Sequence, residues 1–293
     1  MVDRSFSRKT FYVFNAAMFV IYALLCLLPL IHVLSISLSS SVAVTAGQVK
    51  IFPVDFTLKS YEFVLKKVEF WRAMLVSLER IVLGVSLSTM MTILAAYPLS
   101  KSKREFRAQP IFVWMFVFTM LFSGGMIPSY MIVRYTGLID KIWALVIPGA
   151  VQVFNVVLLM NYFRTIPKEI EESAFMDGAS HWRILWKIFL PMSLPSLATI
   201  VVFAVVGNWN SWFDGLIYMN DSHNYPLQTY LQSILVAPNV KLITKAYADL
   251  MRKINDRTLK AAQVFIAAIP VLLIYPFLQG YFISGIMLGG VKE

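Results

Sequence analysis

Six long stretches of this chain contain no Asp, Glu, Lys or Arg, and each has at least 20 residues. About 20 apolar residues in a helix cross a hydrocarbon core of about 30 Å. Since 58% of the 293 residues are hydrophobic and only 14% are charged, a water-soluble globule is excluded. We expect an all-α membrane protein with one transmembrane domain over residues 1–293. The predicted spans cover about 11–35, 74–99, 110–133, 142–163, 193–218 and 261–286.

The net charge of +10 does not indicate a nucleic-acid partner. A nucleic-acid-binding protein needs a solvated basic face or an aromatic platform, whereas much of the basic charge here flanks the apolar stretches. The single cysteine, Cys26, lies inside the first predicted span. Disulfides and cysteine-based metal sites are therefore excluded, and we expect no metal site.

The basic residues also indicate an orientation. Residues 100–109 carry four basic groups against one acid, and dense basic charge in a short loop favours the cytoplasmic side. With six spans, both termini are then cytoplasmic. The loops 40–70 and 219–260 are expected outside, and the polar segment 164–191 is expected inside.

The segment 164–191 predicts a helix, a break and a second helix. Pro167 suits a first helical turn, and Glu169 places negative charge near the positive end of the helix dipole. Gly178 can adopt the left-handed conformation that ends a helix, and Ser180 can cap the next one.

The first of these helices ends in an apolar pair, Phe175 and Met176. Two short amphipathic helices held between spans form a knob that suits a groove in a soluble partner. The alternative is a loop that simply lies on the bilayer surface.

The same segment contains a spaced motif. Glu172-Ser173-Ala174 is followed by three residues, Gly178, nine residues and then Ile188-x-Leu190-Pro191. This pattern resembles the E-A-A-x3-G-x9-I-x-L-P signature of permease subunits of bacterial ABC importers. The one departure is Ser173 for the first alanine, which exchanges one small residue for another.

The resemblance extends along nearly the whole chain to the carbohydrate branch of that family, the maltose-type second permeases. It includes Tyr97-Pro98-Leu99-Ser100, Phe122-Ser-Gly-Gly-Met-Ile-Pro128 and Trp209-Asn-Ser-Trp-Phe213. Within the branch, the sequence is most similar to permeases that import acidic plant and algal oligosaccharides such as alginate. The acidic substrate rests on this likeness alone.

The resemblance implies a type I importer permease fold in the bacterial inner membrane. The implied partners are a related second permease, two copies of a cytoplasmic ABC ATPase and a periplasmic binding protein. No G-x-x-x-x-G-K-[ST] phosphate loop occurs in the chain, so ATP and Mg are expected on the ATPase. We expect no catalytic residue, no bound cofactor and no enzymatic activity in this chain.

The resemblance also implies that the segment 164–191 docks in a cleft of the ATPase and acts as a rigid lever. Glu172 would pair with a basic residue, Ala174 would permit close approach, and Gly178 would fix the angle between the two helices. The expected docking residues are Glu172, Ser173, Ala174, Phe175, Met176, Asp177 and Gly178.

Amides and aromatic rings can bind sugar hydroxyls and ring faces. Residues with this chemistry on the fourth and fifth spans are candidates for the substrate path: Gln152, Asn155, Asn208, Trp209, Asn210 and Trp212. The competing interpretation is an interfacial aromatic belt with interhelical hydrogen bonds. Glu79 and Arg80 lie near the outer end of the second span. They could either anchor the helix structurally or take part in the sugar path.

Three alternatives to an importer of acidic sugars remain. An ABC permease for neutral sugars would share the same motif. A secondary transporter driven by an ion gradient would need buried ionisable residues near the middle of the membrane. A membrane-embedded enzyme would need clustered catalytic groups, but the three histidines are scattered at His32, His181 and His223.

Overall fold

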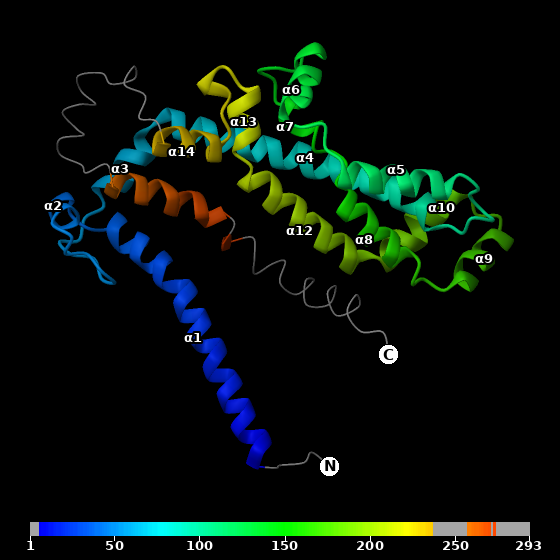
Figure 1. Ribbon diagram of the computed structural model, residues 1–293, viewed down its shortest axis with the longest axis horizontal. Coiled ribbons are helices and arrows are strands. Elements are labelled where there is room, and N and C mark those ends of the chain that lie inside the picture. The colour runs from blue at the N-terminus through cyan, green and yellow to red at the C-terminus, as the bar shows by residue number, and fades with distance from the viewer. Residues whose placement is uncertain (1–5, 237–256, 271, 274–293) are drawn as a thin grey trace. The chain divides into compact units, whose positions relative to one another are not determined.

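The computed structural model describes residues 6–236, 257–270 and 272–273 (Figure 1). Within these ranges the regular secondary structure is entirely helical, with no strand. The chain divides into two compact units. The first comprises residues 1–68 and 233–269, and the second comprises residues 69–232 and 270–293.

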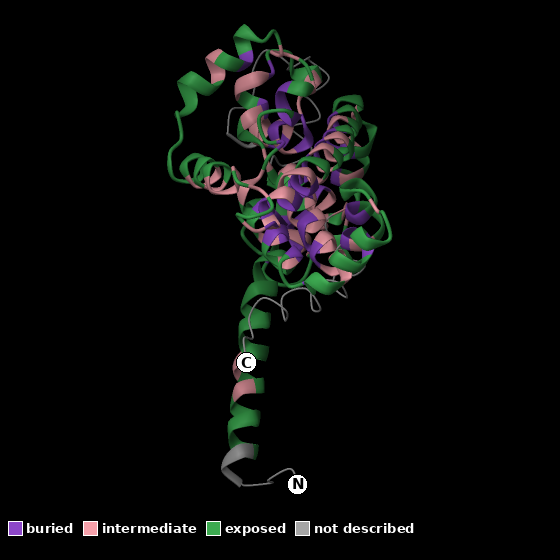
Figure 2. Cartoon of the chain, turned by 90° about the vertical axis from the view of Figure 1, so that its right-hand side faces the viewer, coloured by how far each residue is buried: buried purple, intermediate pink, exposed green. Residues whose placement is uncertain are grey.

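The first unit contains the longest exposed apolar helix. Its elements are α1 (Phe6–Ser37), α2 (Ser41–Thr45), α3 (Lys59–Lys66) and a helix over 257–270 that ends next to the unit boundary. The part of α1 from Lys9 to Ser37 is long and apolar enough to cross a membrane, and most of it is exposed (Figure 2). A helix that exposes apolar side chains on all sides is suited to a lipid environment.

A small core stabilises the connection that follows α1. Ile36, Ala43, Val44 and Val49 are buried together, and Ala261 of the helix 257–270 packs against them. Ser40 caps α2 by accepting a hydrogen bond from the Ala43 amide at 3.2 Å. The beginning of the predicted outer loop 40–70 is therefore folded onto the end of the first span.

The second unit is built around α4 (Val68–Ser100), a 33-residue helix that begins at the unit boundary. The other elements follow in chain order: α5 (Gln109–Leu121), α6 (Met126–Tyr135), α7 (Trp143–Val146), α8 (Val153–Phe163), α9 (Lys168–Met176), α10 (His181–Ile184), the π-helical turn η1 (Leu185–Phe189), α11 (Leu190–Met192), α12 (Leu194–Asn210), α13 (Phe213–Tyr218), the 3-10 turn η2 (Ser222–Asn224) and α14 (Leu227–Val236).

The main core of this unit lies at the end of α4, where α8, α9, α10, η1, α11 and α12 also contribute buried side chains. Aromatic rings form its centre. The ring centroids of Tyr97 and Phe189 lie 5.2 Å apart, and those of Phe163 and Phe189 lie 5.4 Å apart, both edge to face. Such aromatic pairs add to the stabilisation from burial alone.

Three predicted spans are interrupted in the structure. The predicted span 110–133 is made of two helices, α5 and α6, which meet at an angle of 114° around Gly125, whose φ is +84°. With 13 residues, α5 is only about 20 Å long. Residues 147–152 separate α7 from α8, and Ser211 and Trp212 separate α12 from α13.

Length and apolar composition identify two described helices that could each cross a membrane, or up to four if each bent pair counts as one span. Six spans therefore remain a prediction. The helix over 257–270 contains the beginning of the predicted span 261–286, but residues 271 and 274–286 lie outside the described residues. The part of the predicted outer loop at 237–256 also lies outside them.

Candidate functional site

The polar segment 164–191, called the interspan segment below, begins with the short helix α9. This helix starts at Lys168, directly after Pro167, whose φ is −55° and ψ is 132°. Glu169 and Glu171 occupy its first turn, where the helix dipole favours negative charge. The first half of the predicted helix, break and helix is therefore present.

Gly178 makes the break. Its φ is +77°, and the Ala179 amide donates to the Ala174 carbonyl at 2.9 Å, while the Gly178 amide donates to the Phe175 carbonyl at 2.9 Å. These bonds close a helix end of the Schellman type. A Cβ added to Gly178 would meet no atom within 4 Å, so the backbone conformation, rather than lack of space, favours glycine here.

The second helical piece begins at His181 and runs through α10, η1 and α11 without interruption. The Ser180 hydroxyl accepts a hydrogen bond from the Arg183 amide at 3.4 Å, which gives the predicted cap. At Ser193 the chain turns, so that residues 181–192 lie at 82° to α12. The interspan segment therefore crosses the direction of the following apolar helix rather than extending it.

The outward face of α9 presents an apolar tip beside acidic groups. Met176 is 88% exposed and Phe175 is 40% exposed, and we call this pair the apolar knob. Glu172, Ser173 and Asp177 are also exposed. Large apolar side chains beside carboxylates on a short fixed helix can bind a groove that has basic residues on its rim.

The inward face of α9 is held by the core. Ala174 is buried there, so this predicted docking residue packs against its own chain. Glu171 forms an ion pair with Lys101, whose Nζ lies 4.1 Å from the ring centroid of Tyr97 and 4.3 Å from that of Phe189. Burial lowers the pKa of Lys101, and the hydrogen bond with Glu171 opposes this effect. Lys101, Glu171, Tyr97 and Phe189 form what we call the Lys101 cluster.

Two further bonds join the end of α4 to the interspan segment. The Tyr97 hydroxyl and His181 Nδ1 lie 3.2 Å apart, and Arg164 Nη2 donates to the Leu99 carbonyl at 3.1 Å. The charge pattern of residues 100–109 predicts only a basic loop beside a span, and this cluster was not predicted. The available signal was the spacing of Tyr97 and Lys101, since residues four apart are neighbours on a helix.

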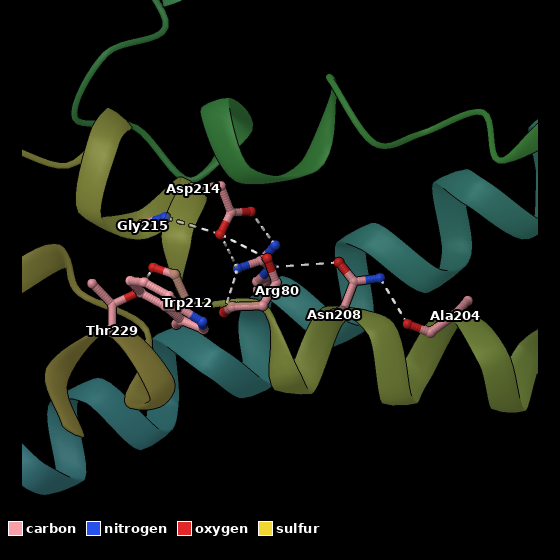
Figure 3. Close-up of polar contacts among 8 residues, drawn as sticks. Arg80, Ala204, Asn208, Trp212, Asp214, Gly215 and Thr229 are labelled. Atoms are coloured by element: carbon pink, nitrogen blue, oxygen red, sulfur yellow. Dashed lines mark hydrogen bonds and ion pairs between the residues drawn. The ribbon is translucent and has the colours of Figure 1, made fainter. Parts of the chain in front are cut away.

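A second polar cluster lies where α12 breaks before α13 (Figure 3). Arg80 of α4 is only 3% exposed and forms an ion pair with Asp214. Arg80 Nη1 donates to Asp214 Oδ1 at 3.2 Å and to the Ser211 carbonyl at 3.3 Å, and its Nε donates to Asn208 Oδ1 at 3.4 Å. We call these four residues the Arg80 cluster. A Cβ on Gly84 would lie 2.8 Å from Asn208 Oδ1, so glycine lets α4 and α12 approach closely.

The broken helix has partners for its free backbone groups. Asp214 Oδ1 accepts from the Gly215 amide at 2.9 Å at the start of α13, and the Thr229 hydroxyl donates to the Trp212 carbonyl at 2.8 Å (Figure 3). Buried backbone groups left without partners would be costly, so these contacts let the chain break inside an apolar region.

The predicted substrate-path residues fall into separate environments. Asn155, which is 1% exposed, donates to Gln152 Oε1 at 2.8 Å, and Asn208 belongs to the Arg80 cluster. Trp209 is buried. Asn210 and Trp212 are exposed.

The two neighbouring charges of the second span also differ. Glu79 is exposed, whereas the guanidinium of its neighbour Arg80 is buried against Asp214. The partner of Asp214 could not be found from local sequence, because Arg80 lies 134 positions earlier in the chain.

A protein family described as the binding-protein-dependent transport system inner membrane component matches residues 105–287. The chain belongs to this family. One relative of this chain is the "Polygalacturonan/rhamnogalacturonan transport system permease protein YtcP" of Bacillus subtilis (strain 168). It is 38% identical over 271 residues, which cover 92% of this chain and 94% of that protein.

The maltodextrin transport system permease protein MdxG of Bacillus subtilis (strain 168) is 26% identical over 92% of this chain and 95% of its own length. A solved chain from a bacterial ABC transporter involved in the import of the acidic polysaccharide alginate superposes with a TM-score of 0.88. It is 34% identical and covers 96% of this chain and 100% of the solved one.

These comparisons confirm the fold and the class of protein. The chain has the type I permease fold and is a permease subunit of a carbohydrate ABC importer, and it resembles a subunit of the alginate importer. In this family the permease is the non-enzymatic membrane component, and a separate subunit hydrolyses ATP.

Proposed function

We propose that this chain, with a related second permease, forms the path by which acidic oligosaccharides enter the cell. A periplasmic binding protein delivers the sugar, and two copies of a cytoplasmic ABC ATPase, which hold ATP and Mg, supply the energy. The interspan segment docks in a cleft of one ATPase. The chain crosses the inner membrane six times with both termini in the cytoplasm.

The apolar knob on a fixed base is the observation that carries this proposal. The side chain of Met176 is almost fully exposed, while Ala174, two residues earlier, is buried in the core. Exposed methionine and phenylalanine on a helix held rigidly from behind are suited to a preformed groove, because little backbone conformational freedom is lost on docking. The exposed carboxylates of Glu172 and Asp177 are suited to basic residues at the edge of that groove.

The position of the basic loop after α4 supports a cytoplasmic location for the interspan segment. Contacts of Lys101 and Leu99 with Glu171 and Arg164 place the two segments together. The loop also exposes three basic side chains, Lys103, Arg104 and Arg107. Because short loops rich in Lys and Arg favour the cytoplasm, the same orientation follows for the interspan segment.

The names of the relatives support an acidic substrate. Polygalacturonan and alginate are polymers of uronic acids, and the proteins named for them are 38% and 34% identical to this chain. The relative named for maltodextrin, a neutral sugar, is 26% identical. A neutral oligosaccharide remains the second candidate substrate because that relative covers as much of the chain.

Among the six candidate path residues, Asn210 and Trp212 have the exposure that a sugar contact requires. They flank the break between α12 and α13, and broken helices often line binding sites in transporters. Gln152 and Asn155 bond to each other at the start of α8, and Trp209 is buried, so these three are weaker candidates for a sugar contact.

The proposal is tested by Gly178→Arg in the assembled importer. We expect the variant to reach the membrane and to lose coupled sugar uptake, because a bulky cation at the break disturbs the docking face. Gly178→Asn is the matched control, since asparagine tolerates a positive φ. Uptake at the wild-type rate by Gly178→Arg would refute the docking proposal.

The substrate class is tested separately with the purified importer in liposomes. We expect its ATPase activity to rise when the binding protein is loaded with acidic oligosaccharides. Uptake should require ATP and should ignore proton and sodium gradients, which distinguishes it from a secondary transporter. Stimulation by neutral sugars alone would contradict the acidic substrate and leave the family unchanged.

A further inference from the structure

The helix α4 approaches the interspan segment through side chains rather than along the chain. The segment follows α8 directly and leads directly into α12, so any movement of α9 reaches these two helices through the backbone. Lys101, just after α4, and Glu171 of α9 are 70 positions apart in the sequence. The side-chain contacts of α4 with α9 are therefore a direct route by which α4 can follow such a movement, in addition to its packing against α8 and α12.

The Lys101 cluster provides this connection in an unusual environment for lysine. Lys101 is 9% exposed, whereas Lys103, two residues later, is exposed to solvent. Burial of a charged amine is costly unless it is paired. Here one carboxylate, Glu171, and the faces of two rings, Tyr97 and Phe189, surround the ammonium group, and both ring contacts are within cation–π distance.

The cluster contacts both helical pieces of the interspan segment. Glu171 belongs to α9, and Phe189 belongs to η1 in the second piece. Tyr97 also lies at hydrogen-bond distance from His181, the first residue of α10. The end of α4 is thus joined to each side of the break at Gly178.

The two faces of α9 have different partners. Glu171 and Ala174, three residues apart, point into this chain, while Glu172 and Met176, four residues apart, point outward. A force applied to the outward face of a rigid helix is transmitted through the contacts of its inward face. The ion pair of Glu171 with Lys101 is the charged contact on that inward face.

We propose that Lys101 is a positioning residue that makes α4 move together with the interspan segment when the ATPase closes. The inference rests on the proposed docking of that segment. In this arrangement the apolar knob receives the force, and the Lys101 cluster passes it to α4. Loss of the cluster leaves docking intact and separates ATP hydrolysis from sugar movement.

The test is Lys101→Met in the complete importer in liposomes, with sugar uptake and phosphate release measured together. Methionine is one atom shorter than lysine and can still pack on the two rings, but it cannot pair with Glu171. We expect the ATPase to co-purify and to hydrolyse ATP, and the sugar imported per ATP to fall by about tenfold. Lys101→Arg should restore most of the ratio, because it keeps the charge and the ring contacts.

Two controls separate coupling from folding. Lys103→Met removes an exposed lysine from the same loop and should leave the ratio unchanged. Glu171→Gln keeps the shape of the other partner and should lower the ratio in the same direction as Lys101→Met. Glu171→Gln also tests the proposal if Lys101→Met yields little assembled importer.

Sugar import per ATP at the wild-type ratio in Lys101→Met and Glu171→Gln would overturn the inference, even if the amount of importer fell. Failure of the proposed docking has a different result. In that case Gly178→Arg would import sugar normally, or the wild-type chain would not retain the ATPase, whatever the Lys101 variants did.

Discussion

One ion pair with a buried cation lies in the first half of α4 and another just after its end, and the two are built differently. Arg80 uses a planar guanidinium with both Asp214 oxygens, a backbone carbonyl and an amide oxygen as acceptors. Lys101 uses a single ammonium group with one carboxylate and two ring faces. The first geometry is directional, whereas the second lets the cation shift among its contacts.

The difference indicates two tasks for the two ends of one helix. The Arg80 cluster satisfies the polar groups of a broken helix and therefore holds α4 against α12 and α13 in one arrangement. The Lys101 cluster joins α4 to the interspan segment, which we propose moves with the ATPase. Variants of the first cluster should therefore reduce stability, and variants of the second should reduce coupling.

The largest loss of stability is expected from Asp214→Ala. It leaves the Arg80 guanidinium buried without its carboxylate, and breaking one partner of a buried pair costs about 3–5 kcal/mol. The melting temperature of the purified importer should fall clearly. Sugar import per ATP should stay near the wild-type ratio in the importer that still assembles, whereas a changed ratio with normal stability would contradict the assigned tasks.

A smaller loss is expected from Gly84→Ala. The new Cβ would lie 2.8 Å from Asn208 Oδ1, so α4 and α12 must separate or Asn208 must move. Overpacking of this kind costs about 1–3 kcal/mol. Gly207→Ala is the matched control, because a Cβ there meets nothing within 4 Å of this chain. Equal melting temperatures for the two variants would show that the close approach does not stabilise the Arg80 cluster.

Gly178→Ala should reduce stability less than Gly84→Ala does. The substitution is strained only by the φ of +77°, a conformation that costs about 1–2 kcal/mol for an L-residue. Because the strain is local to the interspan segment, we expect faster protease cleavage there with little change in the global melting temperature. Gly178→Asn should be cleaved more slowly than Gly178→Ala, and the reverse order would contradict the role assigned to the backbone.

The smallest effect is expected for a contact at the surface, that of Asp221 Oδ1 with His223 Nδ1, because both side chains are more than half exposed. Asp221→Asn should leave the melting temperature at pH 7 unchanged within error. The backbone amide of His223 lowers the pKa of Asp221. Any contribution of ionised Asp221 to the stability of the fold is therefore complete above the ordinary pKa of an aspartate. It is lost only as the pH falls through the lowered pKa of the folded state. A clear fall in the melting temperature of Asp221→Asn at neutral pH would show that side-chain exposure does not predict how much such a contact stabilises the fold.

The sequence predicted the parts of the fold that depend on local rules. The apolar stretch before Ser37 became one long helix, and Gly178 and Ser180 ended and capped helices as expected from their types. Local rules failed where a helix could break because distant groups satisfied its backbone. The break at Ser211 depends on Arg80, and nothing in the sequence near either residue indicates that pairing.

The candidate docking surface was predictable for a similar reason. A spaced motif fixes Glu172 and Gly178 along a short segment, and an apolar pair beside them indicates an exposed tip. The inward contacts of α9 were not predictable, because Lys101 and Glu171 meet only after α4 and α9 have packed together. Ala174 illustrates the same point, since its place in the core rather than at the surface follows from tertiary packing.

The proposed docking of the apolar knob in the ATPase can be tested directly by cysteine cross-linking. Cys26 is the only cysteine, so Cys26→Ser gives a background in which Met176→Cys is the single thiol of this chain. We expect Met176→Cys to cross-link to the ATPase in the assembled importer, with a yield that changes when ATP binds. Tyr135→Cys, at an exposed position on the predicted outer side, should give no such product. Absence of a Met176→Cys product in an importer that contains the ATPase and transports sugar would contradict the account.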